Sequence, residues 1–309
     1  MSGFNYKWLQ GAIQTTGSVV PKILPRVIAF GVFGFFVYLF DHHGLPVSQV
    51  GIANIVPGIV LGLLLVFRTN TAYERFWEGR KLWGSIVNTT RNLSRKIWVF
   101  VEESTPIDRT HKIVILRLLV AFAVTTKLYL RQEPLNEEVR NLLSPTQYVT
   151  LQGIEHPPLE IVFWVNDYLN KQRQTGKIHI YEMISIVHLL NQLVDYLGSC
   201  ERILRTPMPL AYSIHLKQLL LLYCLMLPFE IVSTMGWLTG IVSALTSFTL
   251  LGIEEIGVEI ENPFGRDPND LPLDSICDNL RRHVEDLITQ SPGHYTWLDE
   301  PNISDLIEQ

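Results

Sequence analysis

The sequence predicts an all-α integral membrane protein with four transmembrane helices that continue into a cytosolic helical domain. Three observations lead to this fold class. Two pairs of long apolar segments lie far apart in the chain, the region between them has helical periodicity, and Lys and Arg are absent from the short loop within each pair. Only 18% of the 309 residues are charged, whereas a soluble domain usually carries about 25%.

The four apolar segments approach the length that crosses a bilayer, which is roughly 20 residues in a helix. One pair precedes the polar middle of the chain and the other follows it. We expect the spans at about residues 23–40, 50–67, 216–235 and 237–260. The loops within the pairs are so short that each pair is expected to form a tight hairpin in the lipid bilayer.

The distribution of Lys and Arg predicts the orientation of the spans, because cytoplasmic loops carry an excess of both residues. The loop at residues 41–49 and the junction around Gly236 contain neither. The opposite ends of the spans are flanked by basic residues: Lys7, Lys22, Arg26, Arg68, Arg75, Arg80, Lys81, Lys217 and Arg266. Both termini and the middle of the chain are therefore expected on the cytoplasmic side.

The middle of the chain, at about residues 69–213, is expected to be helical. Apolar or aromatic residues recur at three- and four-residue spacing, with charges between them, in residues 71–103, 110–133 and 180–204, which is typical of amphipathic helices. Pro134, Pro145 and the pair Pro157–Pro158 are expected to mark loops. With no internal repeat or linker, residues 1–309 are expected to form one domain that ends in a C-terminal segment, 262–309.

Composition and motifs exclude several classes of function. No GxSxG, HExxH, Walker or dinucleotide-binding motif occurs, so no catalytic residue is assigned and an enzyme is not expected. The net charge of −5 argues against nucleic acid as a partner, since nucleic-acid binders present a basic surface. Three widely spaced cysteines, Cys200, Cys224 and Cys277, indicate neither a disulfide framework nor a metal knuckle.

One stripe in the second span is a candidate functional surface. Ile59, Leu63 and Phe67 stand at i, i+4 and i+8 and share one helix face, and Gly58 and Gly62 beside them allow close helix approach. Alone, such a stripe is ordinary packing or lipid-facing surface. If several copies surrounded an axis, it would line a narrow apolar constriction of the kind that gates ions by dewetting.

The same helix leaves the membrane at Arg68 without a Pro or Gly break. A cation at this edge is expected either to extend to the interface or to pair with an acidic residue. Glu74, six residues on, is not on the same helix face, so a pairing partner must come from another helix.

The last span ends in an acidic segment. Four glutamates (Glu254, Glu255, Glu259 and Glu261) are followed by a Pro-broken loop with further oxygen-bearing side chains: Asn262, Asp267, Asn269, Asp270 and Asp274. Such hard oxygen ligands in a turn could hold Ca²⁺. They could equally serve as helix caps and turn residues, and the spacing favours caps.

Three segments together resemble the bestrophin family of ion channels: "NPFGRDPNDLPLD" from Asn262, "FRTNTAYERFWEGRKLWG" from Phe67, and "CERILRTPMPLAYSIHLKQLLLLYCLMLPF" from Cys200. The resemblance extends over roughly residues 20–285. It implies a homopentamer with a pore on the fivefold axis, in a bacterial inner membrane or a thylakoid membrane.

The resemblance also implies roles for particular residues. The second helix would line a neck of three apolar rings at Ile59, Leu63 and Phe67, with Arg68 as a charge at the pore edge. A cytosolic constriction would fall at Ile184, or at Ile180 if a gap is placed differently.

Animal members of the family carry a Ca²⁺ clasp in the acidic segment, and Glu259, Asn262, Asp267 and Asp270 match its positions. Arg266, Pro268 and Asn269 interrupt the acidic cluster here. We therefore expect a channel without the animal-type Ca²⁺ switch and with no cofactor beyond the permeant ion. Chloride and other monovalent anions are the expected permeant ions. The alternatives are a cation-selective (sodium or potassium) channel of the same architecture and a non-conducting membrane scaffold.

Overall fold

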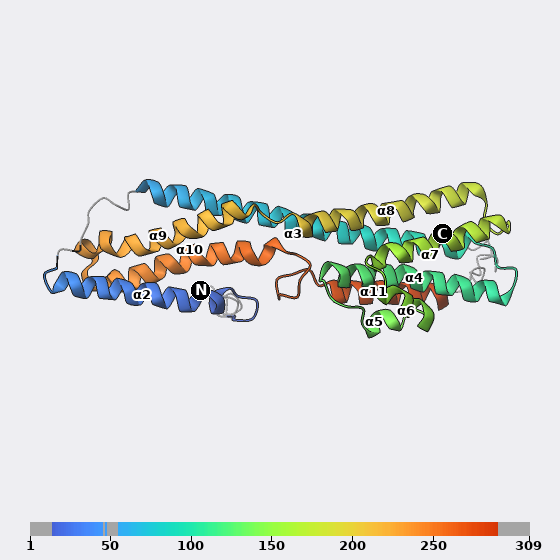
Figure 1. Ribbon diagram of the computed structural model, residues 1–309, viewed down its shortest axis with the longest axis horizontal. Helices are drawn as coiled ribbons and strands as arrows, with labels where there is room; N and C mark the ends of the chain where they lie inside the picture. The colour runs from blue at the N-terminus through green and yellow to red at the C-terminus, as the bar shows by residue number, and fades with distance from the viewer. Residues whose placement is uncertain (1–13, 46, 48–54, 290–309) are drawn as a thin grey trace, which may run out of the picture. The chain divides into compact units, whose positions relative to one another are not determined.

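The computed structural model describes residues 14–45, 47 and 55–289, and the elements that it contains there are all helical, which confirms the expected all-α class (Figure 1). The α-helices are α2 (Val20–His42), α3 (Ile55–Phe100), α4 (Pro106–Leu130), α5 (Glu137–Arg140), α6 (Pro145–Gln152), α7 (Pro157–Gln174), α8 (Ile180–Arg205), α9 (Leu210–Met235), α10 (Thr239–Glu261) and α11 (Leu273–Thr289). A short 3₁₀ turn, Gly236–Leu238, joins α9 to α10.

The chain divides into two compact units, each built from two separated segments. The first unit combines residues 1–79 with 203–271, and the second combines 80–202 with 272–309. The sequence alone indicates one continuous domain and does not reveal this division, because no change of composition marks either boundary.

The first unit contains the four expected membrane spans. Three of them correspond to α2, α9 and α10, and the remaining one corresponds to the start of α3; its expected residues 50–54 lie outside the described residues. Small residues bring α2 and α10 together, since a Cβ added at Gly240 would lie 2.8 Å from the backbone oxygen of Gly31. Close approach through small residues is how membrane helices associate when no hydrophobic effect drives them together.

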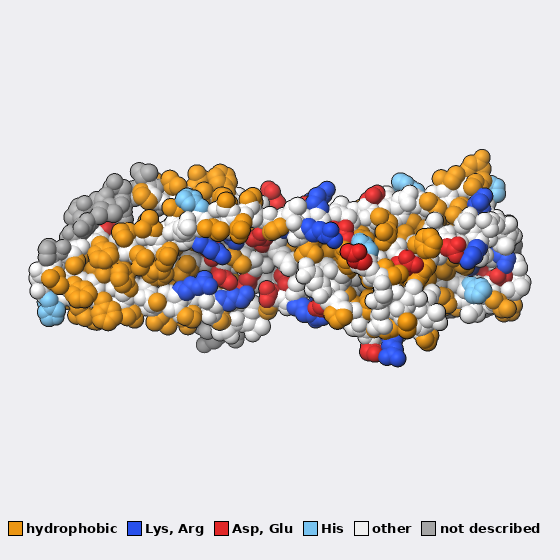
Figure 2. Space-filling model, in the orientation of Figure 1, with side chains coloured by type: hydrophobic (Ala, Val, Ile, Leu, Met, Phe, Trp, Pro, Cys, Tyr) orange, Lys and Arg blue, Asp and Glu red, His pale blue; other side chains and the backbone are white. Residues whose placement is uncertain are grey.

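The helices of the first unit direct their apolar side chains outward, as a lipid environment requires. The apolar windows of α2 and of the α9–α10 pair are only 22% buried, and residues such as Phe36 and Leu245 are exposed. Hydrophobic side chains cover much of the visible face over α2, α9 and α10, and Lys and Arg side chains gather at the end where α2 begins (Figure 2).

Helix α4 is equally apolar but has the opposite environment. Its apolar window is 78% buried, with α7 and α11 packed against it. The amphipathic pattern expected for residues 110–133 is therefore wrong. Consecutive residues from Leu118 to Leu128 are buried on every side of the helix, because α4 is the central core helix of the second unit.

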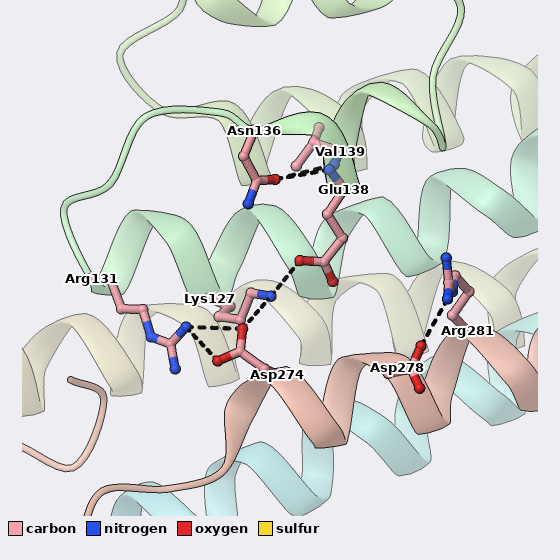
Figure 3. Close-up of polar contacts among 8 residues, drawn as sticks. All are labelled: Lys127, Arg131, Asn136, Glu138, Val139, Asp274, Asp278 and Arg281. Carbon is pink, nitrogen blue, oxygen red and sulfur yellow. Dashed lines mark hydrogen bonds and ion pairs between the residues drawn. The ribbon is translucent and has the colours of Figure 1, made fainter. Parts of the chain in front are cut away.

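Polar contacts anchor α11 to α4 in the second unit (Figure 3). Lys127, only 1% exposed, donates hydrogen bonds to Glu138 at 2.6 Å and to Asp274 at 2.9 Å, and Arg131 donates to both carboxylate oxygens of Asp274. Burial acts to raise the pKa of Asp274, but the hydrogen bonds from Lys127 and Arg131 outweigh it and hold that pKa below its usual value. The charge of Lys127 is thus fully compensated, as a buried ammonium requires.

Two of the prolines expected to mark loops begin helices instead. Pro145 and Pro157 occupy the first turns of α6 and α7, after the N-cap residues Ser144 and His156. Proline suits this position because its missing N–H would have no partner in the first turn of a helix.

The inner face of α3 in the first unit supports a prediction about stability. Leu61 and Leu65 are buried against Leu216 and Leu220 of α9. Truncation of Leu61 to alanine is expected to cost about 2–5 kcal/mol, because the cavity cannot fully collapse. The thermal unfolding midpoint of the detergent-solubilised protein should fall clearly for Leu61→Ala and little for Val60→Ala, since Val60 is 47% exposed. Equal shifts for the two variants would contradict this packing.

Candidate functional site: the apolar stripe of α3 and its polar end

The apolar stripe in the first part of α3 faces away from the rest of its unit. Ile59, Leu63 and Phe67 are 64%, 53% and 55% exposed. Val60 and Val66, which the sequence analysis did not single out, are exposed to a similar degree. The exposed apolar face of α3 is therefore wider than the three expected residues.

The opposite face of α3 fixes the stripe in this orientation. It packs on α9 through the Leu61–Leu65 cluster, and the hydroxyl of Tyr212 donates a 2.7 Å hydrogen bond to the backbone oxygen of Leu64. A rotation of α3 about its axis would disrupt these contacts. The outward direction of the stripe follows from packing on its other side.

The Arg68 side chain is buried against the rest of the first unit and does not lie on the exposed face of α3. It is 2% exposed, its Nη2 lies 3.5 Å from Oε2 of Glu261, and its Nη1 donates to the Ser213 hydroxyl at 3.3 Å. Glycine at position 257 makes room for it, since a Cβ there would lie 3.2 Å from Nε of Arg68. The expected partner from another helix is thus Glu261 of α10, and the Arg68 side chain does not reach the exposed stripe.

Glu261 and Arg75 connect three segments of the first unit, a role that their positions in the sequence did not predict. Glu261 Oε1 accepts a hydrogen bond from the backbone N–H of Met208 at 2.9 Å. The Arg75 guanidinium donates to three backbone oxygens, those of Glu261, Thr206 and Ile203. Together these contacts hold the ends of α8 and α10 against α3, on the C-terminal side of the stripe.

The loop after α10 is organised by its own residues. The Asn262 side chain accepts a hydrogen bond from the backbone N–H of Phe264 at 3.3 Å, and Phe264 is fully buried. A Cβ at Gly79 would lie 3.0 Å from Cγ of Pro263, so the Pro-Phe pair packs directly on the glycine of α3. The Asn-Pro-Phe-Gly segment therefore works as a turn that closes on α3.

Two of the carboxylates suggested for Ca²⁺, those of Glu259 and Asp270, have partners within the protein. Glu259 pairs with Lys22 at 2.9 Å and accepts from Asn269 at 2.6 Å. Asp270 Oδ2 accepts from the backbone N–H of Asp267 at 2.7 Å. Within residues 14–45, 47 and 55–289, no group of three or more His, Cys, Asp or Glu side chains is arranged to hold a metal ion.

The two residues suggested for a cytosolic constriction lie at the beginning of α8. Ile180 and Ile184 are one turn apart and are 46% and 59% exposed. Gly176, with φ +74°, forms the turn that precedes them, a conformation that glycine adopts without strain. Both isoleucines belong to the second unit.

These features define a polytopic helical membrane protein with an exposed apolar stripe on one long helix. Residues 4–286 match the family model described as bacterial/fungal bestrophin protein. The chain belongs to this bestrophin family.

Similar proteins of known name agree with this assignment. The chain is 60% identical to a voltage-dependent anion channel-forming protein of Nostoc sp. over 286 residues, which cover 93% of each chain. It is 31% identical to a protein of the same description from Escherichia coli. The 277 aligned residues cover 88% of this chain and 89% of the relative. A crystal structure of a bacterial bestrophin homolog from Klebsiella pneumoniae aligns with a TM-score of 0.77 and 28% identity, covering 88% of this chain and all of that chain.

Proposed function

We propose that this protein is a homopentameric anion channel that conducts chloride and other monovalent anions passively through an axial pore. The observation that carries the proposal is the exposed apolar face of α3, with Ile59, Leu63 and Phe67 directed away from their own subunit. Five copies around an axis would form stacked apolar rings, and such rings oppose ion passage by dewetting. The name shared by the relatives, anion channel-forming proteins, supports anions as the permeant class.

The test is reconstitution into a planar bilayer with asymmetric KCl. An anion channel should reverse its current close to the chloride equilibrium potential, and a cation channel close to the potassium equilibrium potential. A protein that carries no current at any voltage would be a scaffold. Native mass spectrometry of the same preparation should give five copies per particle, and any other stoichiometry contradicts the pentamer.

The proposed site residues divide into a neck and a second constriction. Ile59, Leu63 and Phe67 form the neck, and Ile184, with Ile180 one turn before it, forms the cytosolic constriction. The side chains of these α3 and α8 residues are exposed within their own subunit. This supports the assignment, since a residue buried within its own subunit cannot line a pore. Arg68 is assigned a positioning role instead, because its guanidinium is buried against Glu261.

We propose that both termini face the cytoplasm or the stroma, in a bacterial inner membrane or a thylakoid membrane. The basic residues that flank the spans support this orientation. A membrane-impermeant thiol reagent should label His43→Cys, in the exposed turn after α2, from outside intact cells. It should label Ser104→Cys, in the exposed segment between α3 and α4, only after the membrane is opened. Labelling of both from one side would contradict the four-span arrangement.

We also propose that Ca²⁺ does not gate the channel. Glu259 is held by Lys22 and Asn269, and Oδ2 of Asp270 accepts from the backbone N–H of Asp267, so Ca²⁺ bound through these oxygens would have to displace their partners. Open probability in bilayers should be the same with chelator and with micromolar free Ca²⁺. A steep rise on adding Ca²⁺, lost in Asp270→Asn, would show that the loop rearranges into a binding site.

A further inference from the structure

A cavity of about 380 Å³ lies among α2, α9 and α10 of the first unit. Most of its wall is apolar, formed by side chains that include Phe30, Leu220, Leu221 and Leu251. Leu221 is 53% exposed, so the cavity borders the outward apolar surface of the membrane spans. An acyl chain from the surrounding bilayer can therefore reach it.

Three ionisable side chains, Arg26, Lys217 and Glu254, complete the wall of this cavity. Within the described part of the chain, the one ion pair of Arg26 is a long one, 3.6 Å from Glu255, and more than half of the Arg26 side chain is exposed. Lys217 is exposed, and no hydrogen bond or ion pair within the described residues engages it. Two cations thus stand at the rim of an apolar cavity, at the end of the spans where basic residues are concentrated.

The buried side chain of Glu254 is a separate indication that the cavity holds a polar ligand. It is 2% exposed, and its Oε1 atom has no hydrogen-bond partner within the described residues. A buried carboxyl oxygen without a donor is costly, and a hydroxyl-bearing ligand in the cavity, whose wall includes Glu254, would supply such a donor.

We propose that the cavity binds the headgroup and the upper acyl chain of an anionic glycerolipid that carries headgroup hydroxyls, such as phosphatidylglycerol. Basic pockets between membrane helices are suited to anionic headgroups. Arg26 and Lys217 hold the phosphate, a headgroup hydroxyl donates to Glu254, and the acyl chain lies along Phe30 and Leu221. The ion pair of Arg26 with Glu255 is long, at 3.6 Å, and Lys217 has no ion pair within the described residues, so a monoanionic phosphate supplies a counter-charge to both cations.

Lipid binding to the delipidated, detergent-solubilised full-length protein tests this proposal without any current measurement, so its outcome is separate from that of the channel proposal. When each lipid is added back, native mass spectrometry should show bound phosphatidylglycerol, and phosphatidylcholine should bind far more weakly. Soluble glycerophosphoglycerol, which offers the same phosphodiester and hydroxyls without acyl chains, should not displace the lipid. Displacement by glycerophosphoglycerol would identify a soluble-anion site instead.

Variants separate the cavity from general surface charge. Arg26→Gln and Lys217→Gln should each weaken phosphatidylglycerol binding about fivefold, as expected for the loss of one basic contact to an anionic lipid. The matched control is Lys22→Gln, which removes the same charge from the same end of α2 but from a residue that pairs with Glu259. It should leave binding unchanged.

Glu254→Gln tests the headgroup hydroxyl. This variant removes one negative charge from the cavity wall, so its preference should shift from phosphatidylglycerol toward the more highly charged phosphatidic acid. The proposal is overturned if the parent protein binds no phosphatidylglycerol, as it would if a neighbouring copy filled the cavity. It is also overturned if Lys22→Gln weakens binding as much as Lys217→Gln does.

Discussion

Replacing Ile59, Leu63 and Phe67 together by alanine is expected to increase the current through the reconstituted protein. Each ring of five apolar side chains offers a passing ion no hydrogen-bonding partner, so the ion must give up part of its hydration to pass. Alanine widens the tube and removes most of this apolar surface. The measurement is open probability and single-channel current in bilayers under symmetric chloride.

The variant should fold, because the three side chains are more than half exposed within their own subunit and support little of its core. A matched control is available on α10. Ile241, Leu245 and Phe248 are also exposed apolar residues and supply the same three residue types. Their triple alanine variant should conduct like the parent. A larger current from the α10 variant than from the α3 variant would place the pore on another helix.

Replacing Arg68 by alanine is expected to destabilise the protein by about 3–5 kcal/mol, the usual cost of removing one partner from a buried ion pair. The change leaves Glu261 without its cation, at a carboxylate that is only 19% exposed. The measurement is the thermal unfolding midpoint of the detergent-solubilised protein. Arg117→Ala is the control, because Arg117 and Glu285 form a pair with both side chains well exposed, worth at most about 1 kcal/mol.

A second substitution distinguishes charge from packing at this pair. Glu261→Gln in the Arg68→Ala background removes the uncompensated carboxylate while keeping an oxygen that accepts from the backbone N–H of Met208. The double variant should regain part of the lost stability. If it is instead less stable than Arg68→Ala alone, the loss in the single variant arises from packing of the arginine side chain.

The sequence predicted the course of the helices well because their signals are local. Three of the apolar segments correspond to α2, α9 and α10, and the absence of a break after Phe67 correctly indicated that α3 continues as one helix to Phe100. The three expected residues of the stripe are exposed because their spacing of four residues follows from helix geometry alone.

Other features depend on contacts between distant segments and leave no pattern in the sequence. Arg75 binds backbone oxygens at the ends of two other helices, and any residue type could supply these oxygens. The Glu259 carboxylate forms an ion pair with Lys22, which lies near the beginning of the chain. The burial of α4 could not be read from its composition either, because an apolar helix in a core resembles one in lipid.

The contacts that fasten α3 to the end of α10 also have a consequence for synthesis of the chain. Arg75 and Glu261 are 186 residues apart, and Arg68 shares the same late partner. At ribosomal rates of 5–20 residues per second, roughly 10–40 s pass between the appearance of the cations and that of the acceptor. During that interval water and lipid phosphates solvate the Arg68 guanidinium. Arg75, in contrast, can already bind the backbone oxygens of Ile203 and Thr206. The ion pair that fixes Arg68 therefore forms only after the fourth span has been synthesised.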